Sequence, residues 1–386
     1  MANELLLRNG SVFTEAGRFE KKNLLLRSGK IQALLPETEY PAGVPSVDCT
    51  GKLLTPGFID IHIHGRDSFD VVSETEKVAA ALPRYGVTAF LPTTLTRSFE
   101  ETLQTMQFLA RYIENQPAGC AQALGIYSEG MYYNREKAGA QNPAYIRDRI
   151  PVSELQQLMD AAGGHLKIVA FAPEVEGAAE ATAFLKEKGI RSSMAHTNAL
   201  YAEIMPCVEA GLDGVTHVYD GMRPMTHIEL GAAGAATFTD SLSTELIADG
   251  YHVNPEFVRI LFRFKALDKV IFISDNVPAS GRPEGRYELG GLPITNLGDR
   301  LVLDTNNGVY SLAGSCLKLC DSIRNVHRFT GIPVEQLIPC ATENPAKYVG
   351  VFDTKGSIAP GKDADINIFD ADMNLLETYI KGQKIN

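Results

Sequence analysis

Short apolar runs alternate with stretches of helical periodicity through the middle of the chain. Eight such runs predict strands, and their apolar character on both faces is typical of parallel strands that are covered on both sides. The predicted strands are 58–64, 88–94, 123–129, 166–174, 190–196, 214–220, 243–250 and 269–275. This βαβα order over about 220 residues predicts a parallel sheet, and polar residues at the strand ends favour a closed barrel.

Helix start signals lie between several of these runs. Ser98 with Glu101 fits a capping box before an amphipathic stretch at 103–113. Ser153 with Gln156 fits a second box before residues 158–162. In such a box the serine side chain and the later acid or amide cap each other's backbone N–H groups, so both pairs predict helix N-termini.

The two ends of the chain differ from the middle. Strand-like runs broken by Asn9-Gly10 and Ser28-Gly29 predict hairpins. The last ~30 residues also consist of short strand-like runs separated by turn residues. We therefore predict an α/β fold: a (β/α)8 TIM-like barrel at 56–352, with a small β-sandwich domain built from both termini at 1–55 and 353–386. A chain of 386 residues is long enough for both parts.

Composition restricts the class of protein. With 45% hydrophobic and 22% charged residues, the chain is typical of a soluble protein with a large core. No run of ~18 apolar residues predicts a membrane span, and no secretory signal is expected at the N-terminus. The net charge of −11, without a Lys/Arg cluster, argues against a nucleic-acid partner. Six scattered cysteines favour reduced thiols and a cytoplasmic protein.

Candidate chemistry gathers where the predicted strands end. In a barrel the C-terminal strand ends meet at one face, where active sites are built. A histidine or carboxylate lies at the end of the first, third, fifth and eighth strands, within the sixth and just past the seventh. These residues are His62, His64, Glu129, His196, Asp275, His217 and His252.

Their chemistry predicts a metal site. His62 and His64 lie two apart on a strand, so both imidazoles can reach one cation. Glu129, His196 and His217 supply two nitrogens and one oxygen, which leaves an open position typical of catalytic metals. We expect a divalent metal, zinc or iron, with one or two ions per subunit. A single strand histidine is more often a hydrogen-bonded core residue; the joint placement is what favours the metal.

Asp275 is predicted to be the general base and acid. It would take a proton as hydroxide forms from metal-bound water, and would later return that proton to the leaving nitrogen. His165 and His327 lack a strand-end placement and are predicted to be surface or packing histidines, whereas His227 stays open as a substrate contact.

The chain resembles the N-acetylglucosamine-6-phosphate deacetylase family of the amidohydrolase superfamily over about residues 50–370. The segments that carry the resemblance are PGFIDIHIHG, LGIYSEG, KAGAQNP, AHTNA, THVYDGM, LIADGYHV, SDNVPASG, LAGS and GSIAPGKDADINIFD. The resemblance implies that Glu129, His196 and His217 hold one metal, that His62 and His64 hold a second, and that the enzyme is a homodimer. It places at the sugar the residues Gln141, Asp220, Gly221, His227, His252 and Ala313.

Departures from the family pattern concern the substrate. Met131 stands where the family has proline, and Gln141 replaces a histidine that polarises the acetamide. Asp220 and Ile228 stand at the positions of the Asn and the Arg that bind the substrate phosphate in the family, where the Arg comes from the neighbouring subunit. A carboxylate repels phosphate, and the loss of an arginine removes a bidentate partner. Either other groups, such as Arg223, Arg282 or Arg286, meet the phosphate, or the substrate has none.

We therefore expect metal-dependent hydrolysis of the N-acetyl group of a small amino sugar, with 6-phosphorylation open. Alternatives are hydrolysis of a cyclic amide, deamination of a base, and a binding protein without activity. Cyclic-amide hydrolases often use a lysine as bridging ligand, whereas Glu129 stands there here. Deaminases pair their His-x-His with a different helix-borne acid, and an inactive protein would be expected to lack a ligand or Asp275.

Overall fold

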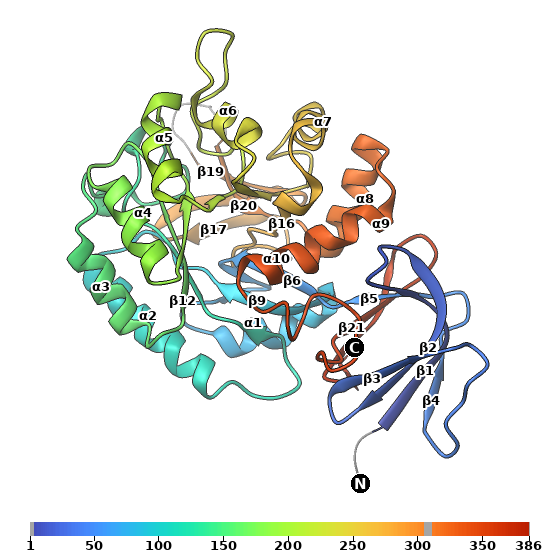
Figure 1. Ribbon diagram of the computed structural model, residues 1–386. Coiled ribbons are helices and arrows are strands. Elements are labelled where there is room, and N and C mark those ends of the chain that lie inside the picture. The colour runs from blue at the N-terminus through green and yellow to red at the C-terminus, as the bar shows by residue number, and fades with distance from the viewer. Residues whose placement is uncertain (1–3, 305–310, 386) are drawn as a thin grey trace.

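Strands from both ends of the chain pair in one sheet. The computed structural model describes residues 4–304 and 311–385. The sheet runs in the order β23-β22-β21-β5-β1-β2-β3, with β4 paired to β1. Its strands are β1 (Glu4–Phe13), β2 (Phe19–Arg27), β3 (Lys30–Leu35), β4 (Ser46–Asp48), β5 (Leu53–Pro56), β21 (Ile366–Phe369), β22 (Leu375–Ile380) and β23 (Gln383–Lys384). Figure 1 shows the first and last segments of the chain side by side, apart from the ring of helices.

This sheet is continuous rather than a pair of separate sheets. Lys30 bridges Asp363, so the edge strand β3 reaches the segment just before β21. Buried side chains from β1, β2, β3, β5, β21 and β22 share one core. The structure thus has one sheet built from both ends of the chain at the place of the predicted sandwich.

The two predicted turns of the N-terminal region have different outcomes. Ser28 and Gly29 join β2 to β3 with φ of 50° and 78°, as in a tight hairpin of the I′ type, which confirms that prediction. The hairpin predicted at Asn9-Gly10 is wrong. Asn9, with φ of 61°, lies inside β1 at a register shift against β2, so the pair forms a bulge that bends the strand.

Parallel strands form the middle of the molecule, at the eight predicted positions. They are β6 (Phe58–Ile63), β9 (Val87–Pro92), β10 (Gln122–Ala123), β11 (Ile126–Glu129), β12 (Leu166–Phe171), β13 (Arg191–Met194), β14 (Gly214–Val215), β15 (Ser243–Leu246) and β16 (Val270–Phe272). One sheet has the order β10-β9-β6 and the other the order β11 to β16. The third predicted strand is thus divided into β10 and β11.

Hydrogen bonds continue between these two sheets. Thr93, just after β9, forms a parallel bridge with Tyr127 in β11. At the other end, Asp275 N donates to His62 O at 2.9 Å, and His64 N donates to Asn276 O at 2.7 Å. The segment that follows β16 therefore lies against the end of β6.

Helices pack around these strands (Figure 1). They are α1 (Thr75–Ala81), α2 (Phe99–Glu114), α3 (Val152–Ala161), α4 (Ala178–Glu187), α5 (Tyr201–Ala210), α6 (Gly231–Phe238), α7 (Pro255–Phe264), α8 (Leu319–Thr330), α9 (Val334–Leu337) and α10 (Glu343–Tyr348). Among the described residues, no helix combines the length and apolarity that crossing a membrane requires.

The two capping-box predictions diverge. At α2 the Ser98 side chain accepts from Glu101 N while the Glu101 side chain accepts from Ser98 N, which confirms the first box. The second box is wrong. Pro151, whose ring fixes φ, occupies the N-cap of α3, so the helix begins at Val152 and Ser153 lies inside its first turn without a capping bond.

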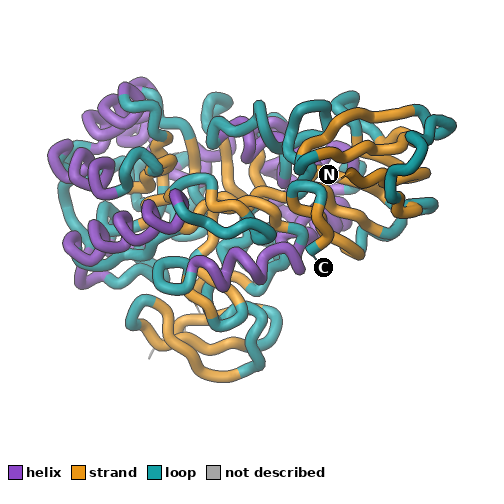
Figure 2. The backbone as a smooth tube through the Cα atoms, turned by 90° about the horizontal axis from the view of Figure 1, so that it is seen from below, coloured by secondary structure: helices purple, strands orange, loops and turns teal. Residues whose placement is uncertain are grey.

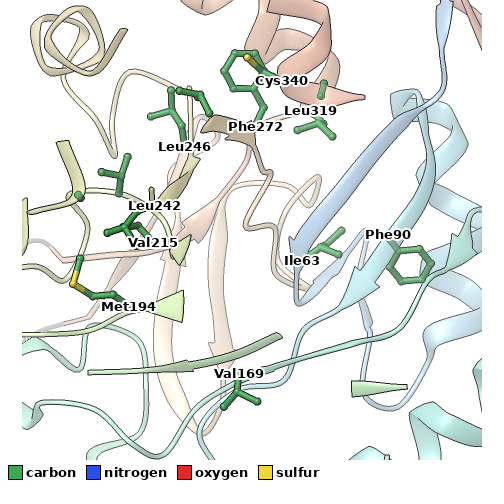
Figure 3. Packing of buried hydrophobic residues seen from close by; sticks show 14 of the residues in the cluster. Ile63, Phe90, Val169, Met194, Val215, Leu242, Leu246, Phe272, Leu319 and Cys340 are labelled. Atoms are coloured by element: carbon green, nitrogen blue, oxygen red, sulfur yellow. The ribbon is translucent and has the colours of Figure 1, made fainter. Parts of the chain in front are cut away.

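Alternate residues of the parallel strands face two different cores. Phe90, Val169 and Phe272 belong to the cluster that the helices cover, and Figure 3 shows them among buried side chains of other elements. Leu91, Ile168 and Ile271, one residue away, belong to a second cluster. This period of two is what strands buried on both faces require. All six cysteines, each within the described residues, are free thiols, and five of them are buried.

An antiparallel sheet that the sequence analysis missed lies between β16 and α8. It has the order β17-β18-β19-β20 and comprises β17 (Gly285–Leu289), β18 (Leu292–Asn296), β19 (Arg300–Leu303) and β20 (Ser311–Ser315). In Figure 2 its strands form a lobe of their own beside the central strands. A short pair, β7 (Gly65–Arg66) and β8 (Phe69–Asp70), follows β6.

Candidate metal centre and catalytic cavity

A cavity of about 370 Å³ opens where the parallel strands end. This volume lies within the range of small-molecule sites. Its lining contains nine of the residues predicted from the sequence: His64, Glu129, Gln141, His196, His217, Asp220, Gly221, His252 and Asp275. The strand ends therefore bring together side chains that are up to about 200 residues apart in the chain, as a parallel α/β architecture does.

The first donor cluster joins three strands. Glu129 is the last residue of β11, and its Oε1 lies 3.3 Å from His196 Nε2 and 3.1 Å from His217 Nε2. The two histidine Nε2 atoms lie 3.2 Å apart. His217 was predicted within the sixth strand, but β14 ends at Val215, so this histidine follows the strand by two residues.

The second donor cluster lies beside the first. His62 Nε2 and His64 Nε2 are 3.3 Å apart, and Asp275 Oδ1 lies 3.2 Å from His64 Nε2. Glu129 connects the clusters, because its Oε2 lies 3.2 Å from His64 Nε2. We call the six residues of both clusters the donor floor: His62, His64, Glu129, His196, His217 and Asp275.

Hydrogen bonds on the far side of the rings orient three of the histidines. His62 Nδ1 donates to Glu245 Oε2 at 2.9 Å, His64 Nδ1 to Thr93 O at 3.1 Å, and His196 Nδ1 to Lys137 O at 2.8 Å. Each of these bonds places the proton on Nδ1 and leaves the Nε2 lone pair directed into the cluster. Metal-binding histidines are held in this way.

The donor floor fits a metal ion on this geometry. The Nε2 lone pairs and carboxylate oxygens of the floor lie 3.1–3.3 Å from one another. All of these atoms are hydrogen-bond acceptors, so they repel one another unless a cation lies among them. Among the described residues, the donor atoms of each cluster all lie within 4.8 Å of one another, and every donor residue is buried. Imidazole and carboxylate ligands suit a divalent transition metal.

Charge compensation within the floor is also visible in the pKa values. Burial would lower the pKa of His62, but the charges of Glu129 and Glu245 hold it well above its ordinary value. Burial would raise the pKa of Glu129, but His62 and the hydrogen bonds of His196 and His217 keep it well below its ordinary value. The opposite shifts show that the carboxylates and imidazoles of the floor are electrostatically coupled.

Left-handed backbone conformations aim several of these side chains. His196, His217 and Asp275 have φ of 43°, 28° and 48°, which non-glycine residues rarely adopt. All three follow the end of a parallel strand, so the chain turns sharply there. Such strain is typical of functional sites. Met131, with φ of 64°, has the same conformation, and proline, with φ near −65°, cannot adopt it.

Asp275 lies between the strands and the missed antiparallel sheet. Ser315 N in β20 donates to Asp275 O at 2.8 Å. Its carboxylate lines the cavity, and although burial would raise its pKa, the hydrogen bond of His64 and the charges of His62 and His217 lower it.

Gln141 contacts the floor directly. Its Oε1 accepts from Thr96 N at 2.8 Å, so its Nε2 points the other way and donates to Glu129 Oε2 at 2.8 Å. The structure therefore adds to the predicted substrate contact a hydrogen bond that fixes the orientation of the Glu129 carboxylate.

Beyond the floor, the cavity lining carries further polar and charged groups. We call this part of the lining the cavity wall, and it consists of Glu136, Lys137, Asp220, Gly221 and His252. His252 Nδ1 donates to Asp249 Oδ2 at 2.7 Å. Burial raises the pKa of Asp220 to about 7. Burial would lower the pKa of His252, but the hydrogen bond that it donates to Asp249 and the charges of the nearby carboxylates raise it to about 9.

Two predicted substrate residues lie elsewhere in the described chain. His227 is exposed and outside the cavity lining, because the loop between β14 and α6 carries it outward. Ala313 is fully buried with Val277 and Ile294 in the core of the antiparallel sheet. The strand alternation of β20 instead directs its neighbours Leu312 and Gly314 to the cavity.

Glu245 is a candidate site residue that the sequence analysis missed. It is 2% exposed, and its Oε2 accepts both from His62 Nδ1 and from His217 N, the latter at 3.3 Å. The available signal was a carboxylate inside an otherwise apolar predicted strand, STELI, since such a group is buried only with a partner.

Known proteins resemble this chain over its whole length. The model of the amidohydrolase family matches residues 53–385. An N-acetylglucosamine-6-phosphate deacetylase of Bacillus subtilis is 34% identical, over 99% of this chain and 97% of that protein. An N-acetylgalactosamine-6-phosphate deacetylase of Escherichia coli is also 34% identical, over 98% of each. The solved structure of the N-acetylglucosamine-6-phosphate deacetylase of Pasteurella multocida has a TM-score of 0.90 at 28% identity, with 99% of each chain covered.

Proposed function

Because the chain belongs to the amidohydrolase family, and within it to the N-acetylglucosamine-6-phosphate deacetylase group, we propose that it hydrolyses the N-acetyl group of an amino sugar to acetate and the free amine. The observation that carries this proposal is the donor floor, where four buried histidines and two carboxylates converge at the cavity. The chain is a hydrolytic enzyme of the family.

Residue roles follow from the geometry. A divalent ion held by the floor would supply Lewis acidity to the acetyl carbonyl. Asp275 accepts a proton from the attacking water, whose oxygen bonds to the carbonyl carbon. It then donates that proton to the amine nitrogen as the C–N bond breaks. Gln141 and Glu245 hold Glu129 and His62 in place. Gly221 and His252 lie where they can contact the sugar.

We further propose zinc or iron as the metal. Glu129, His196 and His217 would hold one ion, and His62, His64 and Asp275 a second. The shared position of Glu129 between the clusters supports two ions per subunit.

For the architecture, we propose a closed (β/α)8 barrel over 56–352 and a terminal domain of 1–55 and 353–386. The hydrogen bonds from the segment after β16 to β6, and the bridge from Thr93 to Tyr127, support closure. A homodimer in the cytoplasm completes the proposal, and the free cysteines support the compartment.

The test is a direct assay. The purified protein, loaded with Zn²⁺ or Fe²⁺, is incubated with N-acetylated glucosamine and galactosamine, each with and without a 6-phosphate, and acetate and free amine are quantified together. We expect equal amounts of both products from at least one sugar. Release of ammonia without acetate, or hydrolysis only of cyclic amides, would replace this function by one of the alternatives.

A further inference from the structure

A carboxylate outside the cavity lining holds the segment that follows His196. This residue, Glu174, lies after the end of β12, and both of its oxygens accept hydrogen bonds from that segment. Its Oε2 accepts from Thr197 Oγ1 at 2.5 Å, and its Oε1 accepts from Asn198 N at 2.6 Å. Thr197 is fully buried, and its hydroxyl oxygen also accepts from Ala199 N at 3.0 Å. One side chain therefore fixes two consecutive residues at a neighbouring strand end.

The segment that Glu174 fixes begins next to a strained residue. His196 has φ of 43°, which a non-glycine residue rarely adopts, and it directly precedes Thr197. Such a conformation persists only where the surrounding structure determines it. Strand β13, which ends at Met194, holds the chain on one side of His196, and the bonds to Glu174 hold it on the other. These bonds therefore help to keep the His196 imidazole directed at the donor floor.

The same segment connects the donor floor to the cavity wall. Thr197 N donates to Gly221 O at 2.9 Å, and Asn198 Nδ2 donates to Glu136 Oε2 at 3.0 Å. Gly221 also lies against the ring of His196, because a Cβ atom added to this glycine would lie 3.0 Å from His196 Nδ1. A shift of residues 197–198 would therefore displace groups of the wall as well as the histidine.

We propose that Glu174 is a positioning residue, which holds a metal ligand of the floor and part of the wall through Thr197 and Asn198. This inference rests on the proposed function, in which the floor binds the metal and the wall contacts the sugar. A carboxylate suits this role because it accepts from an O–H and an N–H group at once and has no donor of its own. Hydrogen bonds to an ionised acceptor are also stronger than those to a neutral one.

The test uses two variants that break the same hydrogen bond from opposite ends. Glu174→Ala removes the acceptor, and Thr197→Val removes the hydroxyl but keeps the shape of the side chain. We expect each to lower the affinity for Zn²⁺ by about tenfold, because loss of the groups that support metal ligands weakens metal binding. KM for the sugar that the wild type hydrolyses fastest should rise by about threefold or more.

Matched variants control for the substitutions themselves. Thr197→Ser restores the hydroxyl and should restore both the Zn²⁺ affinity and KM. Glu176→Ala removes an exposed carboxylate close to Glu174 in the chain and should behave as the wild type. The double variant of Glu174→Ala and Thr197→Val should bind Zn²⁺ no more weakly than Glu174→Ala, since both substitutions break one shared bond.

Chelator competition with Zn²⁺, steady-state kinetics and thermal melts separate positioning from general stability. Weaker Zn²⁺ binding and a raised KM in folded Thr197→Val, with rescue by Thr197→Ser, support the proposal. Wild-type Zn²⁺ affinity in Thr197→Val overturns the role toward His196, and wild-type KM overturns the role toward the wall, even if Tm falls. If Glu174→Ala does not fold, the two Thr197 variants decide. If the wild type releases acetate from none of the four sugars, the proposed function fails, and the Zn²⁺ affinities still decide the inference.

Discussion

The donor floor and the cavity wall lie in one cavity but are built differently. In the floor, three histidines are fixed on the far side of the ring by Glu245, Thr93 and Lys137. In the wall, His252 is fixed by Asp249, but the Asp220 carboxylate keeps an oxygen free of protein partners. The comparison shows that the protein's own hydrogen bonds orient the side chains of the floor, whereas in the wall one carboxylate oxygen has no protein partner among the described residues.

Removal of a floor donor should have the largest effect. His196→Ala leaves Glu129 and His217 without their third partner, so metal affinity should fall by more than about 100-fold and acetate release should be lost. Metal content after dialysis, measured by mass spectrometry, checks this. His165→Ala, at a partly exposed histidine, is the control. A full metal complement in His196→Ala would break the distinction between floor and wall.

Asp275→Asn tests proton transfer separately from metal binding. The amide cannot accept the proton of water, so kcat should fall by about 10²–10⁴-fold. The cluster of Glu129, His196 and His217 is unchanged and should keep its ion. Stopped-assay acetate release and metal analysis of the same sample measure both effects, and wild-type turnover would exclude the assigned role of Asp275.

Glu245→Gln tests the support behind the floor. The amide oxygen can still accept from His62, but the charge that favours its donating Nδ1–H is lost. Metal affinity should fall by about 10–100-fold. A chelator competition titration measures it, with the exposed Glu209→Gln as matched control. If both variants titrate like the wild type, Glu245 serves packing alone.

The wall should show a pH-dependent stability effect and no effect on metal binding. The folded pKa of His252, about 9, lies above its unfolded value of 6.5, so its protonated form stabilises the fold fully below pH 6.5 and progressively less through pH 9. His252→Gln should therefore cost about 2 kcal/mol at low pH and little above pH 9. Thermal melts of both proteins from pH 6 to 10 measure this, and a difference that is constant with pH would refute it.

Sequence patterns predicted the parts of the molecule that depend on local periodicity. The eight parallel strands follow from apolar runs, and the floor follows from the histidines and carboxylates at their ends. Ser98 capped α2 as expected because both halves of its box lie within four residues.

Features set by tertiary context were not predictable in this way. The role of Glu245 becomes visible only in the structure, where its carboxylate accepts a hydrogen bond from the imidazole of His62 on another strand. Ala313 was predicted as a substrate contact because it lies in the segment LAGS. Which face of the sheet a strand residue points to depends on the strand's register, and a short motif does not specify that register. Asn9-Gly10 has the composition of a turn, yet pairing of β1 with β2 on both sides of it makes a bulge.

The pairing of β5 with β21 has a consequence for synthesis. Leu53 pairs with Phe369, so one side of β5 stays open until the end of the chain has emerged from the ribosome. At the usual rates of translation, the roughly 300 intervening residues take about 15–60 s. This sheet is therefore completed after the central strands have had time to fold, and the exposed edge of β5 stays unpaired until β21 reaches it.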